Sequence, residues 1–456
     1  MAGLLSKAPG GVTAREAALR ALAMYRRGNS LPDEALERYT AEMPARESAL
    51  AMKLLSGVLQ NKALCDYYIS CYSKMKLNRI EPQVLDILRI SVYQIVFLTR
   101  IPRSAAVNEG VSLCAKHADR RSSGYVNAVL RKVSQAAETN ALPQITGLNA
   151  EEILSVRYSH PEWLVRELCD ELGSDEAELF LEANNADDVP VCAQVNTLLT
   201  NTEDVLRELG ACGAEVSRHD WLPDCVLLKG AGDITRLEAF RNGHIYIQDA
   251  AARLAVTAAA PKPGMLVIDG CAAPGGKSFA SAIAMENKGR IVAADVTDDK
   301  LLRIKQSAER LGIKIIDTVI NDATAVRGDI TDIIPHKADI VIADVPCSGF
   351  GVIRKKPDIR YKSAQMTEYL PAVQREILKG LSAYVRPGGV LLYSTCTVLK
   401  RENGDVIDWF LSENADYRLE SFSLPHIGDI TTGFCTLMPH IHGTDGFFIC
   451  KLRRRT

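Results

Sequence analysis

Apolar residues recur at helical spacing along roughly the first 135 positions of the chain. Breakers at Leu31-Pro32, Glu81-Pro82 and Ile101-Pro102 separate the periodic stretches. Two stripes show the spacing clearly, namely Ala18, Leu19, Ala21, Leu22 and Tyr25, and Val84, Ile87, Leu88, Val92 and Ile95. The pattern predicts an all-α helical bundle over residues 1–140. The stretch 135–149 has no strong periodicity and is typical of a linker.

Residues 150–246 mix two patterns. The stretches 162–172 and 202–209 have helical spacing, whereas 189–196 and 225–229 are typical of strands. This mixture predicts a small α+β subdomain.

From residue 247 onward, strands and helices alternate. Apolar runs end at Asp269, Asp295, Asp344 and Tyr393. Strands that are apolar nearly throughout are typical of a parallel sheet covered by helices on both faces. We therefore predict a Rossmann-like, doubly wound α/β domain over residues 247–456, and a multidomain protein as a whole.

Charge is distributed unevenly over these regions. The chain of 456 residues holds 54 Lys and Arg against 56 Asp and Glu, for a formal net charge of −2. Residues 1–140 hold 20 basic and 12 acidic residues, 141–246 hold 7 and 20, and 247–456 hold 27 and 24. A basic N-terminal module indicates a polyanionic partner such as nucleic acid. On charge alone, a basic soluble domain without such a partner fits equally well.

Cysteine usage and hydropathy indicate the compartment. The 12 cysteines form no CxxC pair, and a chain of this length needs no disulfide staples, so we expect free thiols in a reducing compartment and no metal site. The N-terminus has too few apolar residues for a signal peptide. No stretch approaches the roughly 18 consecutive apolar residues of a membrane span. We expect a cytoplasmic protein with no membrane partner.

A loop of small residues, 269–278, follows the first strand of the α/β domain and leads into a helix. Small residues let the backbone approach a ligand, and a helix N-terminus offers free N–H groups. A P-loop needs a glycine where Cys271 stands, so its spacing fails, and there is no GxGxxG fingerprint. A purely structural strand–helix turn remains the alternative.

Carboxylates at successive strand ends favour one ligand class. Asp269, Asp295 and Asp344 end strands, and Asp322 follows the apolar Val319-Ile320. Together they would line a crevice outside the carboxyl edge of the sheet. They suit a ligand with ribose, amine and sulfonium groups and no phosphate. S-adenosylmethionine is such a ligand, whereas NAD and ATP are not. Individually, each carboxylate fits a helix cap or an exposed surface position.

Two thiols, Cys347 and Cys396, lie just past strands of the same sheet. A lone strand-end cysteine is usually a small buried filler, but two beside a cofactor loop favour covalent chemistry. Carbon 5 of a pyrimidine becomes nucleophilic when a thiolate adds to carbon 6, and a base must later remove the carbon 5 proton. Asp344 is the natural candidate for stabilising the adduct at a ring nitrogen. Spacing alone leaves open which thiol attacks.

A basic loop, 352–362, lies between the two thiols. It holds five basic residues and one acidic residue, and its Tyr361 is a candidate for stacking on a base. The loop is a candidate phosphate-contacting segment, with an ordinary basic surface loop as the alternative.

Several motifs resemble those of one family, the Sun-type (RsmB) bacterial 16S rRNA cytosine-5 methyltransferases. The similar stretches are Cys271–Ser278, Asp344–Arg354, Tyr393–Thr397 with Glu402-Asn403, and Asp445–Phe448. The N-terminal region is similar to the NusB-type RNA-binding helical domain in the stretches 106–109 and 124–131. The resemblance covers almost the whole chain. It implies a class I methyltransferase domain that transfers a methyl group from S-adenosylmethionine to carbon 5 of a cytidine in 16S rRNA, free or in a small-subunit assembly particle.

The resemblance also implies residue roles. Cys396 is implied to be the nucleophile and Cys347 the thiol that helps to resolve the adduct. The implied donor site comprises Cys271, Ala272, Ala273, Pro274, Gly275, Gly276, Lys277, Asp295, Asp322 and Asp344. The implied RNA contacts are Pro346, which is expected near the target base together with Lys277, and the loop residues Arg354, Lys355, Lys356 and Arg360. Gln194 stands where the family usually has arginine, which puts in doubt any RNA contact made by that arginine.

Three rival functions remain. A non-catalytic RNA-binding assembly factor would need only the basic helical domain, and the two thiols with the strand-end carboxylates argue against it. The same chemistry on tRNA is disfavoured only by the NusB-like resemblance. A P-loop NTPase is disfavoured by the loop spacing.

Overall fold

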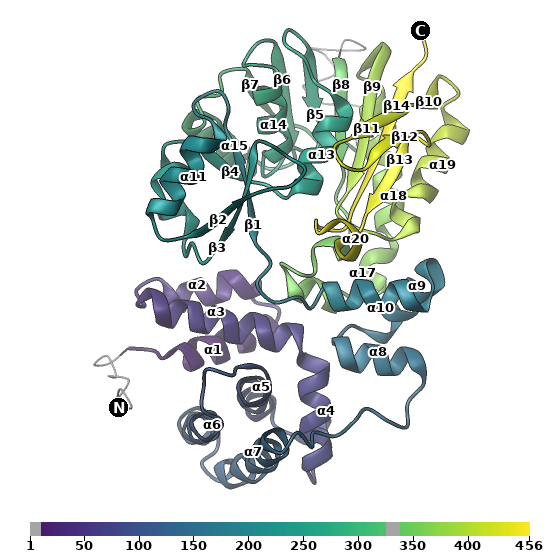
Figure 1. Ribbon diagram of the computed structural model, residues 1–456. Coiled ribbons are helices and arrows are strands. Elements are labelled where there is room, and N and C mark those ends of the chain that lie inside the picture. Colours follow the sequence, from purple (N-terminus) through teal and green to yellow (C-terminus); the bar gives the residue numbers. More distant parts are fainter. Residues whose placement is uncertain (1–10, 325–337) are drawn as a thin grey trace. The chain divides into compact units, whose positions relative to one another are not determined.

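The computed structural model describes residues 11–324 and 338–456, which fall into two compact units (Figure 1). Unit 1 comprises Met1–Leu181 and the short segment Lys356–Tyr361. Unit 2 comprises Glu182–Lys355 and Lys362–Thr456. The chain therefore leaves unit 2 in the middle of the predicted catalytic domain, contributes six residues to unit 1, and returns.

Unit 1 is built from helices (Figure 1). They are α1 (Ala14–Arg26), α2 (Pro32–Thr40), α3 (Ala45–Gln60), α4 (Lys62–Tyr72), α5 (Pro82–Phe97), α6 (Arg103–His117), α7 (Ser122–Glu138), α8 (Ala150–Tyr158), α9 (Glu162–Leu172) and α10 (Ser174–Ala183), whose last residues pass into unit 2, with short 3₁₀ turns η1 (Leu77–Arg79) and η4 (Pro357–Tyr361). Helix α5 is buried on most of its surface, because apolar residues surround its axis. A capping box between Asn149 and Glu152 sets the start of α8.

Unit 2 begins with a small antiparallel sheet. Its strands are β1 (Val191–Val195), β2 (Glu215–Arg218), β3 (Cys225–Lys229) and β4 (Ile245–Ile247), in the order β2-β3-β1-β4. Helix α11 (Thr202–Ala211), η2 (Ile234–Arg236) and helix α12 (Glu238–Arg241) complete this part, and the apolar side of the sheet packs on residues of α11 and α12.

A large sheet forms the centre of unit 2 (Figure 1). Its strands are β5 (Leu266–Asp269), β6 (Arg290–Asp295), β7 (Ile316–Ile320), β8 (Ala338–Asp344), β9 (Val385–Thr395), β10 (Tyr417–Leu419), β13 (Phe434–Leu437) and β14 (Phe447–Arg454). The order is β10-β14-β9-β8-β5-β6-β7, with β13 also pairing with β14. Strands β5 to β9 are parallel, and β14 joins β9 in the antiparallel direction.

Helices cover both faces of the large sheet. One core contains residues of α13 (Ala250–Ala259), α14 (Gly276–Ala284) and α15 (Asp298–Arg310), and the other contains residues of α18 (Leu370–Ser382) and α19 (Gly404–Glu413). Neighbouring strand residues alternate between the cores, so Val267 belongs to the first and Ile268 to the second. The remaining elements are η3 (Phe350–Val352), α17 (Gln365–Glu368), η5 (Lys400–Glu402), α20 (Pro439–His442) and the hairpin of β11 (Phe422–Leu424) and β12 (Gly428–Ile430).

The strand order reverses at β5, which pairs with β6 on one side and with β8 on the other. Ligands of doubly wound sheets bind outside the carboxyl ends of the strands at such a reversal. The predicted fold classes, a helical N-terminal region and a doubly wound α/β domain, are confirmed. The antiparallel β14 is an addition that strand–helix alternation does not predict. Within residues 11–324 and 338–456, no helix is long and apolar enough to cross a membrane.

Candidate active site

The ends of β8 and β9 bring two thiols together. The two strands are parallel with Asp344 opposite Ser394, so the segments that follow them leave the sheet at the same edge. Cys347 Sγ lies 3.2 Å from Cys396 Sγ. The backbone N–H of Gly351 donates to the Cys396 carbonyl at 2.9 Å, which ties the segment after Cys347 to the segment that holds Cys396. The structure thus places side by side the two thiols that the sequence singles out.

The two thiols have opposite pKa shifts. A hydrogen bond from the Cys347 thiol to the Cys396 sulfur lowers the pKa of Cys396, and the same contact raises the pKa of Cys347 well above its ordinary value. The ammonium group of Lys277 also acts to lower the pKa of Cys396. Because the thiolate is the nucleophilic form, this arrangement favours Cys396 as the attacking group.

Asp344 lies beside this pair and is held at both oxygens. Lys277 Nζ lies 2.6 Å from Asp344 Oδ2, and Ser394 Oγ donates to Asp344 Oδ1 at 2.7 Å. The Lys277 side chain is only 8% exposed, and its ammonium group lies 5.0 Å from the centre of the Phe447 ring. The carboxylate and the ammonium therefore form a fixed polar group next to the thiols.

Glu402 and Gln374 support the segment that carries Cys347. Glu402 is fully buried, and its Oε2 accepts from the Ser348 backbone N–H and from Gln374 Nε2, each at 2.9 Å. Gln374 Nε2 also donates to the Pro346 carbonyl at 3.1 Å. The backbone on both sides of Cys347 is thus fixed by one buried carboxylate and one buried amide. The sequence shows Glu402 as a motif residue without a role, and no sequence signal indicates Gln374.

The small-residue loop runs from the end of β5 to the start of α14. Gly275 has φ +107°, and a Cβ there would lie 2.4 Å from the ring of Phe279, so only glycine fits. Ala273 N–H donates to Asp295 Oδ2 at 3.1 Å, which joins the loop to the end of β6. Asp269 accepts from Ser278 Oγ at 2.7 Å, and burial raises the pKa of Asp269 to about 6.

The remaining loop positions form one continuous turn. Cys271 and Ala273 are partly buried, Ala272 is buried, Pro274 is exposed, and Gly276 is the first residue of α14. They lie between β5 and Lys277, at the reversal of strand order.

Polar groups also end β6 and β7. Asp295 Oδ1 accepts from Lys300 Nζ at 2.9 Å and from Val296 N–H at 2.8 Å. Asp322 is exposed, and hydrogen bonds from Thr324 lower its pKa. The neighbouring Asn321 is buried, and among the described residues neither atom of its side-chain amide has a hydrogen-bond partner. An unsatisfied buried amide is typical of a site that a ligand completes, so Asn321 is a candidate that the sequence did not single out.

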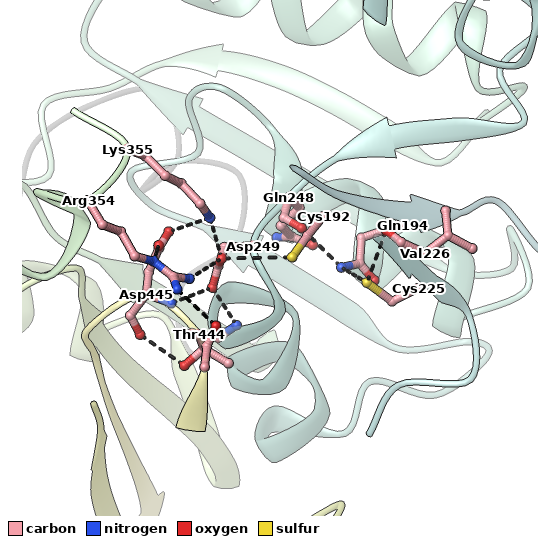
Figure 2. Close-up of polar contacts among 12 residues, drawn as sticks. Cys192, Gln194, Cys225, Val226, Gln248, Asp249, Arg354, Lys355, Thr444 and Asp445 are labelled. Carbon is pink, nitrogen blue, oxygen red and sulfur yellow. Dashed lines mark hydrogen bonds and ion pairs between the residues drawn. The ribbon is translucent and has the colours of Figure 1, made fainter. Parts of the chain in front are cut away.

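Two residues of the basic loop between the thiols, both predicted to contact RNA, already have partners within the protein. Arg354 and Lys355 form ion pairs with Asp249 and Asp445 within unit 2 (Figure 2). The Arg354 side chain is only 8% exposed. The guanidinium of Arg354 is therefore paired with carboxylates of the protein rather than presented to a phosphate. The Lys355 side chain is 30% exposed and is paired with the same carboxylates.

Arg360, a third predicted RNA contact, also has its partners within the protein. It lies in unit 1, is fully buried, and donates through NH1 to the carbonyls of Gln60 at 2.9 Å and Tyr158 at 3.0 Å. Tyr361 Oη donates to the Leu59 carbonyl at 2.5 Å, and its ring packs on the core of unit 1, so it does not present a face for base stacking. Of the predicted RNA contacts, Pro346, Lys355 and Lys356 are exposed, and Lys355 is at the same time paired with Asp249 and Asp445.

Gln194 is buried in the small sheet. Its exposed fraction is 2%, and its Nε2 donates to the Gln248 carbonyl at 3.0 Å and to Cys225 Sγ at 3.3 Å (Figure 2). Position 194 therefore faces the interior of unit 2, and the residue type there bears on packing rather than on an exposed RNA contact.

Comparisons with known proteins agree with this architecture. The family model "16S rRNA methyltransferase RsmB/F" matches residues 256–453, the NusB family matches 12–135, and the ferredoxin-like domain of RsmF/B-like methyltransferases matches 160–235. A probable ribosomal RNA small subunit methyltransferase B of Bacillus subtilis is 35% identical over 91% of this chain and 92% of its own length. The corresponding protein of Shewanella oneidensis is 30% identical over 96% and 99%. A crystal structure of a protein designated PH0851 superposes with a TM-score of 0.78 at 30% identity, covering 99% of this chain and 100% of the other.

The fold and these matches define a methyltransferase with an α/β catalytic domain and a NusB-type helical region. The chain belongs to the RsmB family of ribosomal RNA small subunit methyltransferases, as the motifs in the sequence indicate. Membership implies S-adenosylmethionine as the methyl donor and rRNA as the substrate class. Among the described residues there is no group of three or more His, Cys, Asp or Glu side chains suited to a metal ion.

Proposed function

We propose that this protein transfers a methyl group from S-adenosylmethionine to carbon 5 of a cytidine in 16S rRNA through a covalent bond between Cys396 and the base. The observation that carries the proposal is the pair of thiols 3.2 Å apart, beside the ion pair of Lys277 with Asp344. Methylation of a ring carbon as unreactive as cytosine carbon 5 needs a nucleophile that activates the ring. Transfer to a nitrogen or a hydroxyl needs no such thiol.

The residues at the switch point fit the methyl donor. Residues 271–277 offer close backbone approach, and Asp295 at the end of β6 is suited to ribose hydroxyls. The unsatisfied amide of Asn321 and the exposed carboxylate of Asp322 offer further polar contacts at the end of β7. When bound, S-adenosylmethionine supplies a methyl group activated by a positively charged sulfur.

The residues of the chain would act in turn on the base. The Cys396 thiolate adds to carbon 6, and the ring electrons move toward carbon 5, which takes the methyl group. Negative charge develops at the ring nitrogen, which takes a proton that the Lys277 ammonium supplies through Asp344, itself held by Lys277 and Ser394, and returns it when Cys396 leaves. Once Cys396 has become a thioether, Cys347 no longer donates to a thiolate. Cys347 then helps to pass the carbon 5 proton to solvent, the ring double bond re-forms, and the Cys396 thiolate leaves.

RNA would contact the basic residues of the N-terminal region, where residues 1–140 hold 20 basic and 12 acidic side chains. Pro346 and Lys356 are exposed and remain proposed contacts near the site. The substrate would be 16S rRNA, free or in a small-subunit assembly particle, in the cytoplasm. Deletion of residues 1–140 is a poor test, because Arg360 and Tyr361 are buried against that part of unit 1.

The position of methylation can be tested by tritium release. Full-length protein, the methyl donor and 16S rRNA transcribed with cytidine tritiated at carbon 5 should release one tritium into water for each methyl group incorporated, because the carbon 5 hydrogen is replaced. A 23S rRNA transcript serves as the control and should release none. Methyl incorporation without tritium release would place the methyl group elsewhere and contradict the proposal.

The pH dependence of the thiol provides a second test. Because the thiolate reacts, alkylation of Cys396 by iodoacetamide should be lost as the pH falls through the pKa of Cys396, which the contact with Cys347 lowers. Cys347→Ala removes that donor, so the midpoint of the alkylation rate should move to higher pH, and Cys347→Ser should restore part of the shift. The rate is followed by peptide mass spectrometry. A midpoint that stays in place or moves down in Cys347→Ala would refute this role of the contact.

A further inference from the structure

Four charged residues form one cluster in unit 2, which we call the ionic cluster: Arg354, Asp249 and Asp445, whose side chains are buried, and Lys355, whose side chain is 30% exposed (Figure 2). Arg354 Nε donates to Asp445 Oδ1 at 2.8 Å, and its NH2 lies 3.5 Å from Asp249 Oδ2. Lys355 Nζ donates to Asp445 Oδ2 at 2.9 Å and also pairs with Asp249. Side-chain exposure is 8% for Arg354, 10% for Asp249 and 6% for Asp445.

The ionic cluster joins three segments that are distant in sequence. Asp249 caps α13 by accepting from Ala251 N–H at 2.9 Å, and the same oxygen accepts from Asp445 N–H at 3.1 Å. Arg354 reaches the third segment twice, at Asp445 and at the Gly443 carbonyl, 2.9 Å away. The two cations face two carboxylates, so the cluster is close to neutral and offers little net charge to a phosphate.

The same segments meet again next to the thiols. Gly351 N–H donates to the Cys396 carbonyl at 2.9 Å, and Gly446 N–H donates to the Gly351 carbonyl at 2.8 Å. A Cβ on Gly351 would lie 1.8 Å from the Gly446 carbonyl oxygen and 2.9 Å from the Cys396 carbonyl oxygen, so the three backbones are in direct contact. Arg354 follows Gly351 by three residues, and Asp445 immediately precedes Gly446. The ionic cluster is therefore next in sequence to this backbone contact.

We propose that Arg354 and Lys355 are positioning residues for the two thiols, acting through Asp249 and Asp445, and are not phosphate contacts. This inference rests on the proposed function, since it assigns the spacing of Cys347 and Cys396 a role in the reaction. The ionic cluster fixes the segment that starts at Cys347 against the chain that leads into β14, and Gly351 transmits that position to the carbonyl of Cys396. Small losses of alignment at reacting groups reduce turnover strongly.

The decisive variant is Arg354→Met, with Arg290→Met as the matched control. Arg290 begins β6 and forms an exposed ion pair with Asp317. It therefore lies at the amino ends of the parallel strands, whereas the thiols follow their carboxyl ends. In the tritium-release assay, Arg354→Met should lower kcat by about 10- to 100-fold, while KM for the RNA stays within about twofold and the salt dependence of RNA binding is unchanged. Arg354→Lys keeps the charge and should recover part of kcat. Arg290→Met should match the unmodified protein.

A second measurement needs neither RNA nor methyl donor. Phenylarsine oxide bridges two thiols only when they are neighbours, and peptide mass spectrometry shows whether it joins Cys347 to Cys396. Bridging should be rapid in the full-length protein and at least about tenfold slower in Arg354→Met. If Arg354→Met does not fold by circular dichroism, Lys355→Met replaces it, since that side chain is 30% exposed and contacts the same carboxylates.

Two results would overturn the positioning role. One is a raised KM with retained kcat and a salt slope reduced by about one, which is the behaviour of a phosphate contact. The other is unchanged bridging and unchanged kcat in the folded variants. Failure of the proposed function gives another result, because the unmodified protein would then release no tritium. The rate of bridging by phenylarsine oxide would still show whether Arg354 positions the two thiols.

Discussion

Replacing Cys396 with alanine is expected to abolish methylation and every covalent RNA adduct. Cys396 is the thiol whose pKa the contact with Cys347 lowers. Its removal leaves only Cys347, whose pKa is raised, beside the base. Loss of a catalytic nucleophile commonly costs at least about a thousandfold in rate. Tritium release measures the turnover, and a denaturing gel with labelled rRNA measures the adduct.

Cys347→Ala is expected to give the opposite signature. The base can be attacked and methylated, but release of the adduct is impaired, so a protein–RNA adduct stable to denaturation should accumulate. Cys212→Ala, which removes an exposed thiol from unit 2, is the control and should behave as the unmodified protein. An adduct that persists in Cys396→Ala and is absent in Cys347→Ala would reverse the two roles.

The parts of the site that the sequence predicted well are those fixed by a strand and the residues directly after it. Near-continuous apolar runs identified β5, β6, β8 and β9, and parallel strands present their carboxyl ends at one edge. That is why Cys347 and Cys396 could be placed together before the structure was known. The distance between the two thiols depends on the register that places Asp344 opposite Ser394. That register arises from pairing between distant segments, which local sequence patterns do not show.

The surroundings of the basic residues proposed as RNA contacts are made by distant parts of the chain. A run of basic residues suggests a phosphate surface, yet Arg354 finds its carboxylates 105 and 91 positions away. Arg360 finds its acceptors 300 and 202 positions away. Local composition carries no information on such pairing. The same limit explains why Gln374, whose amide supports the backbone before Cys347, was missed.

Arg360→Ala is expected to destabilise unit 1 by about 3–5 kcal/mol, the cost typical of removing a buried charged group that is hydrogen-bonded to its surroundings. The guanidinium is fully buried, and burial lowers its pKa to about 10. Its positive charge is stabilised there by the carbonyls to which it donates. Removing it leaves the carbonyls of Gln60 and Tyr158 without this donor and opens a cavity in the core of a helical unit.

Hydrogen exchange measured by mass spectrometry on the full-length protein separates the two units, because it reports the opening free energy of each segment. Faster exchange is expected in α3 and α8 of unit 1, which end at the two acceptors of Arg360, with little change in β5 to β9. Arg157→Ala removes an arginine that is 49% exposed and paired with Glu178, and should cost less than about 1 kcal/mol. If Arg360→Ala exchanged no faster than Arg157→Ala in α3 and α8, Arg360 would not stabilise unit 1.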